Sequence, residues 1–201
     1  MSAVGRPSGL ASEAKVYLLH VAALFRPSTA VPAFEVHPIQ PGDLTGWSYE
    51  EHELLITEGR RQLDRQIGSL ERIRSRCQFL FTTAFGLLLV IFGTVRTIAG
   101  PGSHRVVLAL LLWCGSIICI VLGLFGAAAL ITTRKDLKIV DTAVLSRTTP
   151  PVLPQLAVAY ADAVRTGENS VATALTLQRD VVLLVTVGSL AYGTAWLLAV
   201  L

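Results

Sequence analysis

The chain has 201 residues, of which 52 % are hydrophobic and 15 % are charged, and its formal net charge is +3. A soluble domain carries about one-quarter charged residues, so this composition excludes an ordinary soluble domain. Three stretches without formal charge, 77–95, 106–133 and 181–201, reach the length of about 20 residues that crosses a bilayer. We therefore predict an all-α integral membrane protein with three transmembrane helices and cytoplasmic amphipathic helical extensions.

Residues 1–47 are predicted to be a poorly ordered N-terminal segment that ends in a linker rich in Pro and Gly. Within them, the apolar run 16–25 is only about half as long as a span. One interpretation is a signal peptide, because Lys15 precedes the run and Ser28-Thr29-Ala30 resembles a cleavage site. Arg26-Pro27 lies between the run and that site and argues against it. The favoured alternatives are a short surface helix and a translation start placed too far upstream.

Residues 48–76 are predicted to form a cytoplasmic amphipathic helix. Ser48 and Glu51 have the spacing of a capping box at its start, and the acids precede the arginines, as the helix dipole favours. Apolar residues recur near every seventh position, a spacing typical of a coiled-coil seam or of docking on another helix. This stripe is the predicted partner surface, and its members are Ile56, Leu63, Ile67 and Leu70.

Residues 77–133 are predicted to form a transmembrane hairpin, with spans at about 77–98 and 106–131. Gly100-Pro101-Gly102 makes the turn between them. A cytoplasmic segment with a helix then covers 134–180, and the third span covers 181–201.

Cations beside the spans predict the orientation. Six arginines lie between positions 60 and 76 and six cations between 134 and 179, whereas the hairpin turn has only Arg96 and Arg105. Because cytoplasmic segments carry the excess of Lys and Arg, we expect a cytoplasmic N-terminus and an external C-terminus in a bacterial inner membrane. The predicted membrane-interface residues are Arg72, Arg74, Arg76, Arg134, Lys135 and Lys138. The first three either bind anionic lipid or only anchor the topology.

Small residues recur every four positions in the second and third spans, and this spacing lets helices approach closely. Both packing within one subunit and self-association between subunits fit the pattern. The predicted packing residues are Gly115, Cys119, Gly123, Ala127, Ser189 and Gly193.

No motif for chemistry accompanies these spans. The four His residues are isolated, no two Cys have the spacing of a metal site, and neither a P-loop nor a nucleophile elbow is present. Proton and ion pathways usually require ionisable residues at membrane depth. No span in this sequence has a charged residue in its interior. We therefore predict no enzyme, no cofactor and no metal.

The order of elements resembles the transmembrane module of the Pycsar effectors (PycTM-like), three-span membrane proteins of bacterial anti-phage defence. The resemblance covers roughly 50–201. It rests on Ile73-Arg74-Ser75-Arg76-Cys77 before Phe79-Leu80-Phe81, and on the segment from Ala159-Tyr160 to Arg179 before the last span. Arg74 stands where that family has an acid. The resemblance implies membrane disruption by assembled subunits, with a trigger that comes from a partner because the chain has no cyclic-nucleotide-binding domain.

Three functions follow as hypotheses. The first is an oligomerising effector-like module that impairs membrane integrity when triggered. The second is a structural or adaptor membrane protein that recruits a partner through its cytoplasmic helices, and the third is a transporter or holin-like subunit. The expected partners are the lipid bilayer, further copies of the chain and a cytoplasmic protein, but not nucleic acid, because the basic residues cluster beside the spans.

Overall fold

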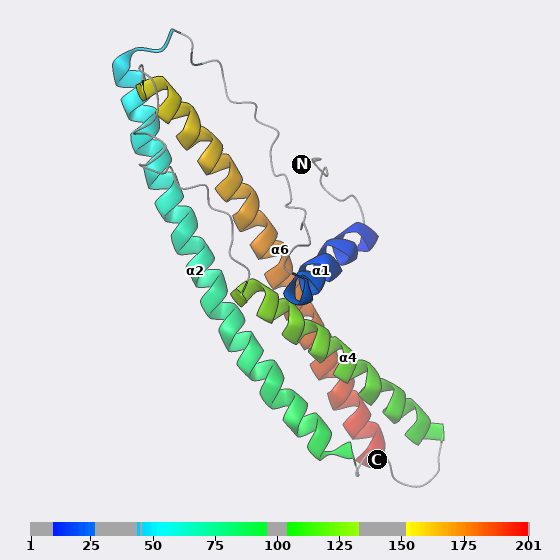
Figure 1. The fold of residues 1–201 in the computed structure, drawn as a ribbon. Coiled ribbons are helices and arrows are strands. Elements are labelled where there is room, and N and C mark those ends of the chain that lie inside the picture. The colour runs from blue at the N-terminus through cyan, green and yellow to red at the C-terminus, as the bar shows by residue number, and fades with distance from the viewer. Residues whose placement is uncertain (1–9, 27–43, 45, 96–103, 133–151, 201) are drawn as a thin grey trace. The chain divides into compact units, whose positions relative to one another are not determined.

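A computed structural model describes residues 10–26, 44, 46–95, 104–132 and 152–200. All regular structure in these residues is helical (Figure 1). The helices are α1 (Leu10–Phe25), α2 (Tyr49–Gly93), α4 (His104–Thr132) and α6 (Val152–Val200). Of these, α2, α4 and α6 are long and apolar enough to cross a membrane. The predicted all-α class with three span-length helices is thereby confirmed.

The start of α2 is the predicted capping box. The Ser48 backbone N–H donates to Glu51 Oε2 at 2.6 Å, and the Glu51 N–H donates to Ser48 Oγ at 3.3 Å. These bonds satisfy two backbone N–H groups at the helix entrance. Gly46, at φ +94°, makes the turn before the cap in a backbone conformation that side chains with a Cβ rarely adopt.

The cap makes the start of α2 sensitive to acid. Hydrogen bonds from Ser48 lower the pKa of Glu51 below its ordinary value. A lowered pKa in the folded state stabilises the helix start above the unfolded-state pKa, and this contribution is lost as the pH falls through the folded-state pKa. We expect NMR titration to show Glu51 protonating at lower pH than an unpaired glutamate, with fraying of Tyr49–Glu51 in the same pH range. A Glu51 titration at the ordinary pKa would contradict this cap.

The described helices belong to two compact units. The first contains residues 49–72 of α2 and 152–175 of α6, and the second contains α1 from Glu13, residues 73–93 of α2, all of α4 and residues 176–200 of α6. The helix bonding of α2 continues without interruption from its charged half into its apolar half. The same is true of α6.

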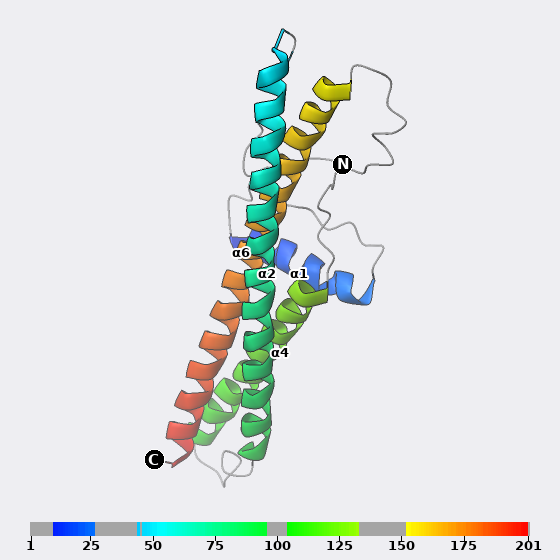
Figure 2. The same ribbon diagram turned by 90° about the vertical axis from the view of Figure 1, so that its left-hand side faces the viewer.

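In the first unit, α2 and α6 lie side by side and run in the same direction (Figures 1 and 2). Small residues at the contact face of α6, Ala157, Ala163, Gly167 and Ala174, are buried. Small side chains let the helix backbones approach closely, and seven-residue spacing keeps one face of a helix toward its neighbour.

In the second unit, α4 runs antiparallel to the included parts of α2 and α6 (Figures 1 and 2). The core is made mostly of small and β-branched residues, which pack closely. Its buried members include Cys77, Ala84, Ile91, Ala109, Ile120, Val181 and Ala195, and the buried Ser116 hydroxyl donates to the Trp113 carbonyl at 2.7 Å.

Helix α1 differs from the poorly ordered segment that the sequence predicts for residues 1–47. It lies across α4 and α6 (Figures 1 and 2), with Val16, Tyr17 and His20 buried. A helix of 16 residues is marginal by itself in water, so packing against the other helices holds it. The short-helix alternative describes this segment, but the side chains that dock it were not predicted.

Candidate functional site

The described residues hold no group of three or more His, Cys, Asp or Glu side chains that could bind a metal ion. The cysteines form no disulfide, with Cys77 buried, Cys114 exposed and Cys119 half-buried. The candidate site is therefore a set of helix contacts. One set lies in the first unit, between α2 and α6, and the other lies in the second unit, where α1 docks.

The predicted partner surface on α2 is only partly open. Ile56 is buried, Leu63 and Leu70 are half-buried, and Ile67 is exposed. Two residues on the same side of α2 contact α6 of the same chain. A Cβ at Gly59 would lie 3.2 Å from Tyr160 Cβ, and Gln66 Nε2 donates to the Val164 carbonyl at 3.0 Å. Intramolecular docking therefore occupies much of this stripe.

Gln66 is a polar residue in the contact between α2 and α6. Its side chain lies where a Cβ of residue 167 would be, so Gly167 makes room for it. Its Oε1 is buried and has no hydrogen-bond partner among the described residues. A buried amide with one unsatisfied atom costs stability, but it favours the helix register in which its other bond forms.

Helix α1 is attached to α4 by Tyr17. The Tyr17 hydroxyl donates to the Leu122 carbonyl at 2.7 Å, and the ring occupies the space left by the missing side chain of Gly126. Burial raises the pKa of Tyr17, so the hydroxyl keeps its proton and remains a donor at neutral pH. At the end of α1, Phe25 packs edge-to-face on Phe125 of α4, with ring centroids 5.6 Å apart.

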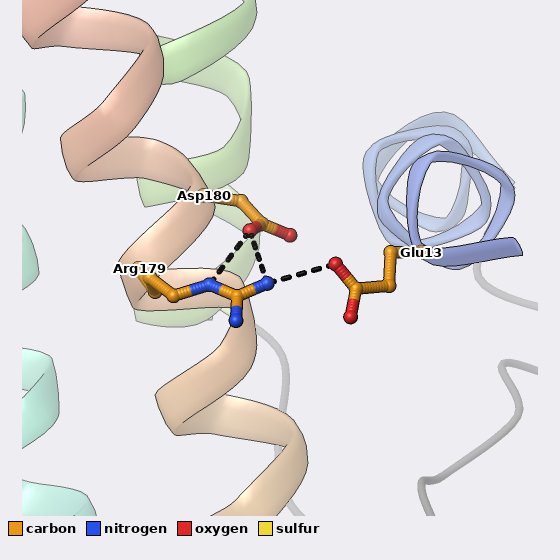
Figure 3. Close-up of polar contacts among 3 residues, drawn as sticks. All are labelled: Glu13, Arg179 and Asp180. Atoms are coloured by element: carbon orange, nitrogen blue, oxygen red, sulfur yellow. Dashed lines mark hydrogen bonds and ion pairs between the residues drawn. The ribbon is translucent and has the colours of Figure 1, made fainter. Parts of the chain in front are cut away.

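Helix α1 is attached to α6 by an ion cluster (Figure 3). Arg179 Nη2 lies 2.8 Å from Glu13 Oε2 and 3.3 Å from Asp180 Oδ1. Arg179 and Asp180 are the last charged residues before the charge-free stretch that begins at Val181. The cluster therefore marks where α6 changes from polar to apolar, and it places the start of α1 at that level.

The predicted membrane-interface residues are only partly described. Arg72, Arg74 and Arg76 are exposed, and Arg72 Nε donates to the Gly68 carbonyl at 3.1 Å. The other three, Arg134, Lys135 and Lys138, lie outside the described residues.

The predicted packing residues have different surroundings in the second unit. A Cβ at Gly123 would lie 2.9 Å from Val185 Cγ2, Ala127 is buried and Cys119 is half-buried. Ser189 Oγ donates to the Val185 carbonyl of its own helix at 2.7 Å. Gly115 and Gly193, by contrast, have no atom of the described helices within 4 Å of an added Cβ.

Two close contacts in this unit, at Gly126 and Gly188, were not predicted. A Cβ at Gly188 would lie 2.7 Å from Ile120 Cγ1 and 3.1 Å from the Ser116 carbonyl oxygen. A seven-residue spacing in the sequence includes Gly188 but not Gly126. In this unit its positions are Val181, Gly188 and Ala195 on α6 and Ala109, Ser116, Gly123 and Leu130 on α4, and in the first unit the same spacing on α6 includes Tyr160, Gly167 and Ala174.

Replacing Tyr17 by Phe tests the attachment of α1. Tyr17→Phe keeps the ring against Gly126 but removes the donor to Leu122, which is worth about 1 kcal/mol for a typical hydrogen bond. We expect amide exchange in α1 to accelerate severalfold, while exchange in the core of α4 is unchanged. Leu18→Met, on the exposed side of α1, is the control. Equal exchange in Tyr17→Phe and the wild type would show that this bond does not hold α1.

In comparisons with known proteins, no protein-family model, curated protein or solved structure matches the chain.

Proposed function

We propose that this chain is an effector-like protein of a bacterial inner membrane. In this proposal α2, α4 and α6 span the bilayer, and the helix pair of the first unit lies in the cytoplasm. A signal from a cytoplasmic partner changes this pair, and the spans then assemble with other copies and impair the membrane.

The observation that carries the proposal is the continuity of α2 and α6. Each is a single helix that contains both a segment of the polar helix pair and an apolar segment of span length. A rotation or displacement of an unbroken helix is transmitted along its length more directly than through a flexible linker. Residues 49–72 and 152–175 are therefore well suited to receive the signal.

The surface of the second unit supports its placement in lipid. Bulky apolar side chains are exposed along all three long helices, among them Phe79, Leu111 and Leu190. Apolar surface of this extent is unusual on a soluble monomer and is typical of contact with a membrane or a partner.

Gly115 and Gly193 support the assembly step. Among the residues that the structure describes, no atom approaches an added Cβ at either position, so neither glycine is needed for the helix packing described above. Small residues on an outer helix face allow close contact between transmembrane helices. We expect Gly115→Leu and Gly193→Leu together to leave the folded chain intact in detergent but to reduce its oligomer size.

Induced expression with a membrane-potential dye tests the proposal. The wild type, supplied with the products of its neighbouring genes, is expected to depolarise the cells under the condition that triggers it. The Gly115→Leu/Gly193→Leu variant, at an equal amount in the membrane, is expected to leave the potential unchanged. Failure of the wild type to depolarise cells with all neighbouring genes present would contradict the effector function.

An adaptor function is the second candidate, and a separate observation favours it. Trp47, Tyr49 and Leu54 are exposed near the start of α2. Such residues suit contact with a cytoplasmic protein. An adaptor would retain a partner without depolarisation, and Leu54→Gln would weaken that retention.

A further inference from the structure

We propose that the outer face of α1 binds the lipid–water interface, so that α1 lies in the plane of the membrane as part of the membrane-bound protein. This inference rests on the membrane placement proposed above. It assigns a lipid contact to a segment too short to cross the bilayer.

The exposed face of α1 is apolar. Leu18 is 55 % exposed and Phe25 is 68 % exposed, and Ala22, also exposed, lies on the same face. The opposite face is buried through Val16, Tyr17 and His20. Helix α1 therefore presents Val16, Tyr17 and His20 to the protein on one side and apolar residues outward on the other.

The outer face of α1 is continuous with the surface of a predicted span. Phe25 contacts Phe125, which belongs to α4 and is itself 38 % exposed. Lipid that covers this part of α4 would also reach Phe25. This continuity favours lipid over a protein partner as the occupant.

The polar groups of α1 agree with an interfacial depth. Glu13 pairs with Arg179 at the polar end of the last span, and Lys15 and Arg26 are exposed at the two ends of the apolar face. Interfacial helices keep cations at the level of the lipid headgroups while apolar side chains enter the acyl boundary. The Tyr17 bond to Leu122 holds α1 against α4 at this depth.

Nitroxide labels on the full-length chain test the inference. Single cysteines replace Leu18 or Phe25 in a background with Cys77, Cys114 and Cys119 changed to Ala, reconstituted in vesicles of phosphatidylethanolamine and phosphatidylglycerol. The measurement is the ratio of collision rates with oxygen, which concentrates in lipid, and with a water-soluble nickel chelate. Leu54, 70 % exposed in the first unit, is the water control, and Leu111, 66 % exposed on α4, is the lipid control.

We expect the oxygen-to-nickel ratio at Leu18 and Phe25 to be severalfold above that at Leu54 and below that at Leu111. Ratios equal to that at Leu54, with Leu111 in lipid, would overturn the inference and leave the proposed function standing. Labels shielded from both reagents would overturn it in favour of a second copy as the occupant. A water-exposed label at Leu111 would overturn the proposed membrane placement itself.

The wild-type chain provides a second test that needs no cysteine replacement. Vesicles with a photoactivatable lipid are irradiated, and mass spectrometry locates the adducts. We expect adducts on Leu18 or Phe25 and none on Leu54, and the absence of adducts from α1 while α4 is labelled would contradict the inference.

Discussion

Gly188→Leu is expected to destabilise the folded chain in detergent, whereas Gly193→Leu on the same helix is not. A side chain at position 188 meets Ile120 and the backbone oxygen of Ser116, and a helix backbone cannot move aside locally. Overpacking of this kind costs typically about 1–3 kcal/mol. A Cβ added at position 193 meets no atom of the described residues within 4 Å.

The comparison of the two variants cancels the stabilisation that comes from replacing Gly by Leu in any helix. Leu favours a helix more than Gly by about 1 kcal/mol or slightly less, and both variants gain this term. The measurement is the free energy of unfolding, or the thermal midpoint, of the monomeric protein in one detergent. Equal stabilities would contradict the contact between α4 and α6.

Gly126→Leu is expected to release α1. The new side chain would occupy the position of the Tyr17 ring and would also meet Val181 Cγ2 of α6 at 2.8 Å from its Cβ. Lys15 is already exposed in the docked helix, and release lets the backbone at this position unfold and enter the active site of trypsin. If docking loses about 1.4 kcal/mol, the undocked population rises tenfold, and cleavage accelerates in proportion when opening is rapid.

Gly115→Leu, on the same helix but with no atom of the described residues within 4 Å of an added Cβ, is the control for this release. Trypsin should cut after Lys15 at the wild-type rate in this variant and at least about tenfold faster in Gly126→Leu. The same rate in both variants would show that α1 does not depend on the space at Gly126.

The helical class and the cap of α2 were predictable because they depend on local patterns. Charge-free runs of span length and the Ser48–Glu51 spacing need no knowledge of tertiary contacts. The same kind of pattern predicted an amphipathic stripe on α2. It left open whether another protein or the chain itself covers that stripe, and α6 covers much of it through the contacts of Gly59 and Gln66.

The packing glycines were harder to predict because four-residue spacing, on which the prediction relied, identifies the buried face of a helix less well than seven-residue spacing does. At about 100° per residue, positions four apart drift by about 40° each, so Gly115 and Ala127 point about 120° apart. Seven-residue spacing drifts much less and identifies the buried face that contains Ser116 and Gly123. The open sides of Gly115 and Gly193 follow from this geometry.

The docking of α1 could not be predicted from periodicity. Tyr17 donates to a backbone carbonyl 105 positions away, and every residue type has such a carbonyl. The space that receives the ring is a missing side chain at Gly126. Only tertiary structure relates these positions.

Reporter fusions test the central claim, that three helices cross the membrane with the helix pair on the cytoplasmic side. Alkaline phosphatase is active only outside the cytoplasm, and green fluorescent protein exported unfolded does not fluoresce. We predict active phosphatase after Gly102 and after Leu201, and fluorescent protein after Lys138. A cytoplasmic signal after Gly102 or Leu201 would contradict this arrangement.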